Sequence, residues 1–199
     1  MDLELKGKTV FITGSTAGIG FATAKALLNE GASVILNGRT SASVKAAIKR
    51  LEQMFPNETI TGIATDFSIL GEVNNLLENL PKIDVLINNV GVYSSGSFFE
   101  TEDAEWYRQF EVNVMSGVRL SKSMLPRMLA NDWGRILFIS SECASLTPPD
   151  LIAYSMTKAA ILAVSRGLAQ LTKGTNVTVN SVIPGSTLSE GAEQFLEDA

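Results

Sequence analysis

Short apolar, β-branched runs alternate with longer helical stretches along the chain, and this alternation restricts the fold more than any other feature. The predicted strands are Lys8–Thr13, Ser33–Asn37, Thr59–Ala64, Asp84–Asn88, Gly134–Ser141 and Val177–Ile183. The predicted helices are Gly18–Glu30, Ser41–Met54, Ser68–Asn79, two helices between Asp103 and Ala130, and Tyr154–Lys173. Strands that are apolar throughout and separated by helices indicate a parallel sheet covered on both faces. The 199 residues therefore predict one doubly wound α/β domain of the Rossmann type, spanning residues 1–199.

The composition disfavours several classes of function. The net charge of −5 and the pI near 4.8 argue against nucleic acid and against an anionic membrane surface, since both attract a basic face. The one cysteine, Cys143, cannot form an internal disulfide, and no apolar run reaches the roughly 18 residues of a membrane span. Residues Met1–Lys6 do not resemble a signal peptide. We therefore expect a cytoplasmic protein that acts on a small molecule.

The sequence contains no histidine. Catalysis by a Ser–His–Asp or Cys–His arrangement is therefore excluded, and so are histidine ligands to a metal. We expect no metal site. Any proton transfer must use a Tyr, Lys, Ser, Asp or Glu side chain.

A glycine-rich segment, Thr13–Gly20, joins the first predicted strand to the first predicted helix. Gly14 permits a tight turn, Gly18 lets a pyrophosphate approach the backbone, and Gly20 lets the helix pack closely. The free N–H groups at the start of this helix attract phosphate. A structural turn is the alternative, but the position between strand and helix favours dinucleotide binding. The cofactor contacts expected in this segment are Gly14, Ser15, Thr16, Gly18, Ile19 and Gly20.

The end of the second predicted strand indicates which dinucleotide binds. NAD enzymes usually place an Asp or Glu about 20 residues beyond the glycines, to bind the ribose 2′-hydroxyl. Here Gly38 and Arg39 occupy this region, and a guanidinium pairs with the 2′-phosphate of NADP. We favour NADP, with NAD and a solvated Arg39 as the alternative. After the third strand, Asp66 either accepts a hydrogen bond from an adenine amino group or caps the next helix, and Phe67 is counted with it as a cofactor contact.

Tyr154 and Lys158 are four residues apart at the start of a predicted helix, so both side chains lie on one face. A free tyrosine has a pKa of about 10, and a neighbouring ammonium lowers this value by favouring the phenolate. Such pairs also occur by chance in many helices. The preceding strand, however, ends at Ser140 and Ser141, and ligands of open α/β sheets bind beyond the carboxyl ends of the strands. A serine hydroxyl there can hold a substrate oxygen beside the tyrosine.

Together these residues resemble the short-chain dehydrogenase/reductase family, from about Gly7 to the end of the chain. The resemblance depends on the segments Thr13–Gly20 and Asn88–Gly91, on Asn113, Ser141, Tyr154 and Lys158, and on Pro184-Gly185. It implies an oxidoreductase that transfers hydride between a nicotinamide cofactor and a carbonyl or alcohol. A dinucleotide-binding sensor or assembly subunit without turnover is the alternative.

The resemblance also implies a role for each matching residue. Tyr154 gives a proton to the carbonyl oxygen, and Lys158 lowers the pKa of Tyr154 and binds the nicotinamide ribose. Ser141 orients the substrate oxygen, and Asn113, which otherwise reads as a helix cap, holds a water in the proton relay. The remaining matches are cofactor contacts: Asn89 and Gly91 line the adenosine side, and Pro184 and Gly185 cover the nicotinamide.

Two features depart from the family pattern. Val90 stands where the family usually has Ala, and the sequence reaches Ala199 without the last strand and helices of the family. The loops Val92–Glu100, Glu142–Ala153 and Ser186–Ala199 are expected to shape the substrate pocket. The helix Tyr154–Lys173 carries more apolar surface than a sheet alone covers, so we expect a homodimer through this helix and the helix Asn113–Ala130.

Overall fold

The computed structural model describes residues 3–187. The strands are β1 (Thr9–Ile12), β2 (Ser33–Gly38), β3 (Ile60–Ala64), β4 (Val85–Asn88), β5 (Gly134–Ile139) and β6 (Val177–Val182). The α-helices are α1 (Gly18–Asn29), α2 (Ser41–Met54), α3 (Leu70–Asn79), α4 (Asp103–Phe110), α5 (Ser116–Ala130), α6 (Cys143–Leu146) and α7 (Ile152–Leu171). A π-helical turn, η1 (Glu111–Met115), joins α4 to α5.

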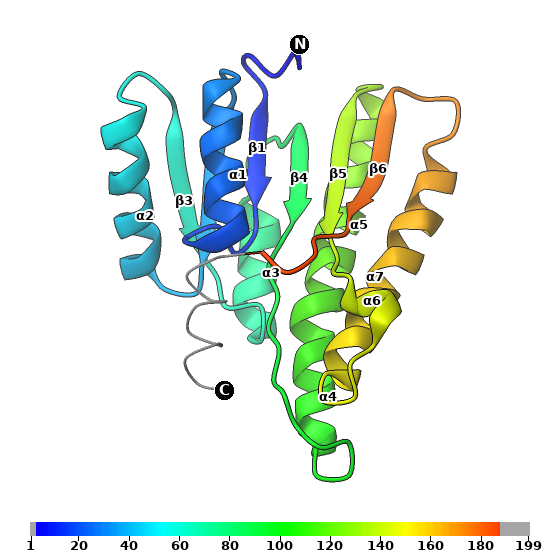
Figure 1. Ribbon diagram of the computed structural model, residues 1–199. Coiled ribbons are helices and arrows are strands. Elements are labelled where there is room, and N and C mark those ends of the chain that lie inside the picture. The colour runs from blue at the N-terminus through cyan, green and yellow to red at the C-terminus, as the bar shows by residue number, and fades with distance from the viewer. Residues whose placement is uncertain (1–2, 188–199) are drawn as a thin grey trace. The chain divides into compact units, whose positions relative to one another are not determined.

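The strands belong to a six-stranded sheet with the order β3-β2-β1-β4-β5-β6 (Figure 1). The strand pairs described are parallel, and helices follow the strands along the chain. This is the doubly wound α/β fold that the sequence predicts. Contacts within the chain divide it into two compact units, of which one reaches up to Asn89 and the other spans Val90–Gly185.

In the first unit, β1 lies between β2 and β4. Phe11 of β1 is paired with Ile35 of β2 on one side and with Leu86 of β4 on the other. These side chains are buried, as a strand covered on both faces requires. The carboxyl ends of β1 and β2 therefore lie side by side, which places the glycine turn after β1 next to the end of β2.

In the second unit, β5 pairs with β6 in register, with Ile136 opposite Val179. The helix predicted from Asn113 begins instead at Ser116, because Asn113 lies in the π-helical turn η1. The strand expected to reach Ser141 ends at Ile139, so Ser140 and Ser141 lie just beyond it. The short helix α6 follows, in a segment expected to be a loop.

Two further expectations concern the last predicted loop and membrane-spanning helices. Most of the loop Ser186–Ala199, expected to shape the substrate pocket, lies outside the described residues. Within residues 3–187, no helix combines the length and apolar character needed to cross a membrane.

Candidate active site

The glycine turn after β1 is fastened to the end of β2 by Asn37. The Gly14 N–H donates to Asn37 Oδ1 (3.0 Å), and Asn37 Nδ2 donates to the carbonyl oxygen of Ile63 in β3 (3.1 Å). The Ser15 N–H donates to the Asn37 carbonyl (2.8 Å), and the Asn37 N–H donates to Ser15 Oγ (2.9 Å). Asn37 is almost fully buried. The sequence analysis did not identify it, because it lies within a run that reads as an apolar strand.

Asn89 holds the other side of the same turn. Its Nδ2 donates to the carbonyl oxygens of Thr13 (2.9 Å) and Gly14 (2.8 Å), and its N–H donates to Thr13 Oγ1 (2.9 Å). The Ser15 hydroxyl donates to the Ile12 carbonyl (2.7 Å). Asn89 and Ser15, both expected to contact the cofactor, therefore use these side-chain groups to shape the turn.

The backbone of the turn suits a ligand that approaches closely. Gly14 and Gly18 have φ angles of +59° and +55°, which favour glycine. A Cβ at Gly20 would meet the Gly14 carbonyl oxygen at 2.6 Å, and a Cβ at Gly38 would meet Thr16 Cγ2 at 2.5 Å. The turn is thus a preformed cradle at the N-terminus of α1, and its residues fit the pyrophosphate of a dinucleotide.

The residues expected to choose the cofactor lie near one another in this unit. Arg39 is exposed, and its positive charge helps to lower the pKa of Asp66, after the larger effect of the hydrogen bond from the Ser68 hydroxyl. Asp66 Oδ1 accepts from the Ser68 N–H (2.9 Å) and Oγ (2.7 Å), whereas the N-cap position of α3 belongs to Ile69. Asp66 therefore forms a local turn and is not the helix cap. The Phe67 side chain is buried in the core.

In the second unit, Ser141 lies close to Tyr154, near enough for its side chain to lower the Tyr154 pKa. The Cys143 N–H donates to Ser141 Oγ (3.2 Å). Tyr154 lies in the first turn of α7, which begins two residues earlier than predicted. The ring of Tyr93 packs edge-on against the Tyr154 ring, with centroids 5.8 Å apart. Tyr93 was missed by the sequence analysis, since a single aromatic residue in a loop carries no signal.

Lys158 is buried one turn further along α7. Its Nζ lies 5.5 Å from the centroid of the Tyr154 ring and donates to the Ile139 carbonyl (2.8 Å). The Ser140 hydroxyl donates in return to the Lys158 carbonyl (2.9 Å). These two buried bonds tie the end of β5, which leads into Ser141, to the helix that carries Tyr154.

Burial shifts the pKa values of the two catalytic candidates, Lys158 and Tyr154, in opposite directions. Loss of solvation lowers the pKa of Lys158 from 10.5 to about 8, because the charged ammonium is the form that burial disfavours. Loss of solvation also raises the pKa of Tyr154 above 10.0, and the hydrogen bond with Ser141 opposes this only in part. The expected lowering of the Tyr154 pKa by Lys158 is therefore not what this structure shows.

Asn113 does not cap a helix. Its Oδ1 accepts from the Val92 N–H (2.7 Å), and its Nδ2 donates to the Val92 carbonyl (2.8 Å) and to Thr157 Oγ1 (3.0 Å). The Asn113 side chain therefore joins η1 to the loop after β4 and to α7. Its backbone lies within the π-helical turn, a feature that is frequent at functional sites.

The remaining expected contacts also lie in the second unit. The Glu142 N–H donates to the Pro184 carbonyl (3.0 Å), which places Pro184 next to the residue after Ser141. A Cβ at Gly185 would lie 3.2 Å from Glu142 Oε2. Gly91 is exposed at the start of the loop that Asn113 holds.

The chain matches the sequence pattern described as short chain dehydrogenase over residues 8–199. It is 49% identical to the uncharacterized oxidoreductase YvrD of Bacillus subtilis, over 100% of this chain and 76% of that protein. The chain belongs to the short-chain dehydrogenase/reductase family, and it is an oxidoreductase of this NAD(P)-dependent class.

Two solved structures extend the comparison. L-sorbose reductase from Gluconobacter frateurii, complexed with NADPH and L-sorbose, is 31% identical, with a TM-score of 0.90 over 100% of this chain and 78% of that one. A structure described as an NAD(P)-dependent gluconate 5-dehydrogenase from Beutenbergia cavernae, with bound NADP, is 29% identical, with a TM-score of 0.92 over 100% of this chain and 80% of that one. Both likenesses agree with the Rossmann-type fold.

Proposed function

We propose that the protein is an NADP-dependent reductase of small carbonyl compounds, with Tyr154 as its acid/base. The observation that carries this proposal is that the Ser141 side chain and the buried Lys158 both lie beside Tyr154: Ser141 is near enough to lower the Tyr154 pKa, and Lys158 Nζ lies 5.5 Å from the Tyr154 ring centroid. A carbonyl oxygen that accepts from both hydroxyls is polarised and lies in reach of the Tyr154 proton. In this proposal, the residues that follow β5 and the Tyr–Lys pair of α7 act together on one carbonyl oxygen.

When bound, the nicotinamide cofactor supplies the hydride. Tyr154 donates its proton to the substrate oxygen, and Ser141 holds that oxygen in place. The negative charge then developing on Tyr154 is stabilised by Lys158, whose pKa of about 8 lets it exchange a proton near neutral pH. Asn113 fixes the loop beside these groups. In the reverse direction, Tyr154 accepts the proton of an alcohol.

Replacing Tyr154 with Phe tests this assignment. The change removes the titrating hydroxyl and keeps the ring, so we expect carbonyl reduction to fall by at least about 100-fold, the usual loss for a general acid. NADPH binding, measured by titration, should be unchanged. Tyr107, exposed on α4, supplies the matched control Tyr107→Phe, which should retain full activity. Near wild-type turnover by Tyr154→Phe would refute the assignment. Binding of NADPH by the wild type without reduction of any carbonyl in a broad panel would instead favour a sensor.

The preference for NADP is the second part of the proposal, and Arg39 supports it. The exposed guanidinium follows β2, at the position where NAD enzymes usually have a carboxylate. Arg39→Ala should weaken NADPH binding by about 1.5–3 kcal/mol, the scale of a charged hydrogen bond, and leave NADH binding unchanged. Lys45→Ala, which removes one exposed charge from α2, is the control. Equal losses for both cofactors would contradict the NADP preference.

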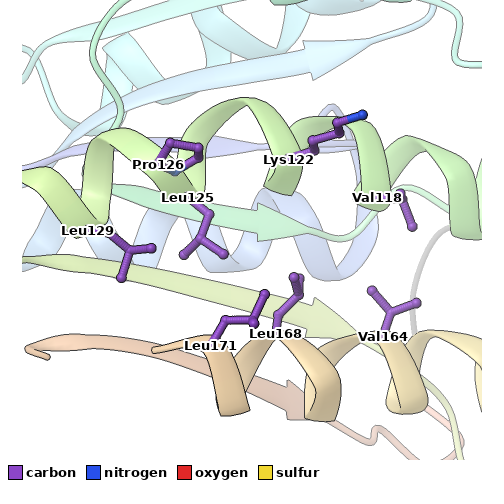
Figure 2. A pocket seen from close by; sticks show the side chains of 8 residues that line it. All are labelled: Val118, Lys122, Leu125, Pro126, Leu129, Val164, Leu168 and Leu171. Atoms are coloured by element: carbon purple, nitrogen blue, oxygen red, sulfur yellow. The ribbon is translucent and has the colours of Figure 1, made fainter. Parts of the chain in front are cut away.

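A homodimer through α5 and α7 is the third part of the proposal. Figure 2 shows the two helices facing each other across a groove of about 390 Å³, with Leu125 and Leu129 of α5 opposite Leu168 and Leu171 of α7. Among the described residues that line it, Lys122 alone is charged. Ile161, also an apolar residue of α7, is buried in the core and does not line the groove. An exposed apolar groove of this kind favours a second copy of the chain.

Sedimentation equilibrium tests this assembly. The wild type should be a dimer at micromolar concentration, and Leu168→Glu should be a monomer because it introduces a charge into the groove. Leu70→Glu, at an exposed position of α3, is the matched control and should remain dimeric. A monomeric wild type would refute the dimer. A cytoplasmic location is also proposed, supported by the single cysteine, which needs no oxidising compartment.

A further inference from the structure

Tyr93 stands beside the proposed proton donor in the loop after β4. Its ring meets the Tyr154 ring at 61°, in the edge-to-face arrangement that aromatic pairs prefer. Tyr93 also contributes to the raised pKa of Tyr154, after the larger effect of burial. At the same time 43% of the Tyr93 side chain is exposed, so the ring has surface left for a ligand at the reacting centre.

The backbone on the N-terminal side of Tyr93 is fixed by Asn113. Both the N–H and the carbonyl of Val92 bond to the Asn113 side-chain amide, at 2.7 and 2.8 Å. Asn113 is in turn held by Thr157, whose hydroxyl donates to the Tyr154 carbonyl (2.7 Å). The residue before Tyr93 is therefore linked to the helix that carries Tyr154.

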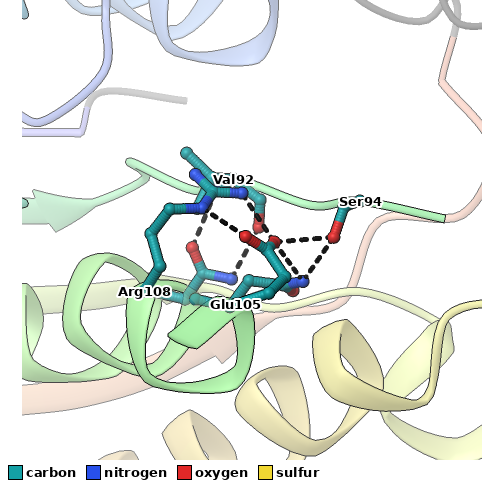
Figure 3. A network of polar contacts seen from close by, with 6 residues as sticks. Val92, Ser94, Glu105 and Arg108 are labelled. Atoms are coloured by element: carbon teal, nitrogen blue, oxygen red, sulfur yellow. Dashed lines mark hydrogen bonds and ion pairs between the residues drawn. The ribbon is translucent and has the colours of Figure 1, made fainter. Parts of the chain in front are cut away.

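The residue on the C-terminal side of Tyr93, Ser94, is held through its side chain by Glu105 of α4. Ser94 Oγ donates to Glu105 Oε1 (2.6 Å), and the buried Gln109 Nε2 donates to both Ser94 Oγ (3.0 Å) and Glu105 Oε1 (2.9 Å). Arg108 holds the same carboxylate with two bonds, at 2.6 and 2.7 Å. Figure 3 shows the loop with Val92 and Ser94 lying over the helix with Glu105 and Arg108.

Two further observations indicate that this anchor is permanent. The hydrogen bond from Arg108 is the largest of the effects that lower the pKa of Glu105 to about 2, so this carboxylate stays charged at every physiological pH. Farther along the loop, Ser95 Oγ donates to Asp150 Oδ2 (2.9 Å) and the Gly96 N–H donates to the Asp150 carbonyl (3.0 Å). The loop is thus fastened before Tyr93 at Val92 and after it at Ser94, Ser95 and Gly96.

We propose that Tyr93 is a specificity-determining residue and that Glu105 is the positioning residue that fixes it. The ring forms a rigid wall beside Tyr154 at which one substituent of the substrate carbonyl must lie. A fixed aromatic surface attracts a flat substituent and leaves no room for a branched one. The preferred substrates are therefore carbonyl compounds with a flat or narrow group on this side. This inference rests on the proposed reductase function.

The first test compares acetophenone, a flat aryl ketone, with the branched tert-butyl methyl ketone. In Tyr93→Ala the ratio of kcat/KM for acetophenone to kcat/KM for the branched ketone should fall by about tenfold or more, since the stacking partner is lost and space is gained. Tyr107→Ala, which removes an exposed tyrosine of α4, should leave the ratio unchanged. A ratio unaltered by Tyr93→Ala, or an equal loss for both ketones, would overturn the role of Tyr93.

The second test concerns Glu105. Glu105→Ala should lower the same ratio by at least about threefold, less than the Tyr93→Ala effect, because the wall loses its anchor without being removed. Glu105→Gln keeps an acceptor for Ser94 and should restore most of the ratio. Glu102→Ala removes an exposed carboxylate next to the same helix and should have no effect. Wild-type ratios in Glu105→Ala would overturn the positioning role.

A third measurement needs no catalysis and separates this inference from the proposed function. In alkaline difference titrations of the free protein, the midpoint of Tyr154 should move down toward 10 in Tyr93→Ala, because the ring then becomes solvated. Glu105→Ala should produce a smaller shift in the same direction, and Tyr107→Ala none. An unmoved midpoint in Tyr93→Ala would overturn the inference. The expected shift without reduction of any ketone would instead count against the reductase function alone.

Discussion

The glycine turn of the first unit and the Tyr154–Lys158 pair of the second are built on different principles. In the turn, buried polar groups are matched: Asn37, Asn89 and Ser15 bond to backbone groups within 3.1 Å. In the catalytic pair, hydrogen bonds and charges compensate for burial only in part. Burial therefore lowers the pKa of Lys158 and raises that of Tyr154.

Each of the two regions preserves a different property. The turn keeps a fixed backbone geometry, since the side chains of Asn37, Asn89 and Ser15 bond to backbone groups in and beside it before any ligand binds. The catalytic pair instead preserves shifted pKa values, because Tyr154 and Lys158 are held where burial disfavours their charged forms. The effect of a substitution in the turn on stability should therefore be independent of pH, and the effect of a substitution in the catalytic pair should depend on pH.

The largest effect is expected for Asn37→Ala. The change removes two part-buried hydrogen bonds, one from the Gly14 N–H and one to the Ile63 carbonyl, so the free energy of unfolding should fall by about 3 kcal/mol at every pH from about 6 to 9. Asn88→Ala is the matched control. Asn88 ends β4 in the same unit and is also buried, yet its side-chain atoms have no hydrogen-bond partner among the described residues. Equal losses for the two variants in urea unfolding would break the distinction.

Gly20→Ala should have the next largest effect. The added methyl group would lie within 3.0 Å of the backbone of Gly14 and Ser15, and overpacking of this kind costs about 2 kcal/mol. The distorted turn should also bind NADPH at least tenfold less tightly, the equivalent of about 1.4 kcal/mol. In Gly167→Ala the methyl group meets nothing within 4 Å, so this α7 variant should be neutral or stabilised by up to about 1 kcal/mol. Calorimetric titration measures the NADPH affinity of both variants. An affinity of Gly20→Ala equal to that of the wild type would contradict the preformed cradle.

An effect of similar size is expected for Lys158→Met, and it appears only at alkaline pH. A lysine whose folded pKa is lowered from 10.5 to about 8 binds its proton less tightly in the folded than in the unfolded chain. Its contribution to stability is therefore constant below about pH 8 and rises as the pH passes from about 8 to 10.5. Relative to Lys158→Met, the wild type should gain about 2 kcal/mol between about pH 7 and pH 9.5. Parallel stability curves for the two proteins in urea would show that burial of Lys158 is not costly.

The sequence predicts the strands and most helices well, because their apolar pattern is local. The helix Ser41–Met54 is observed as predicted, since Thr40 accepts from the Ser43 N–H at its start. The π-helical turn at Asn113 was not predicted. It depends on bonds to Val92 and Thr157, which are 21 and 44 residues away. No periodicity within one segment reports such contacts.

The candidate site shows the same limit. Ser141, Tyr154 and Lys158 were found because their spacing carries a chemical signal, and the structure brings them together in one unit. Asn37 and Tyr93 were missed, because their importance comes from neighbours distant in the sequence. The direction of the Tyr154 pKa was also mispredicted. Spacing on a helix reveals a nearby ammonium, but only the packed structure reveals how strongly burial acts.

The alkaline titration of Tyr154 tests the central contrast most directly. The protein has three tyrosines, and subtracting the phenolate absorbance of Tyr154→Phe from that of the wild type isolates this one. Because burial is the dominant influence, the difference curve of the free protein should have its midpoint above 10.0. A midpoint below this value would mean that Lys158 already stabilises the phenolate in the free protein, and it would contradict the account of an electrostatically unbalanced catalytic pair.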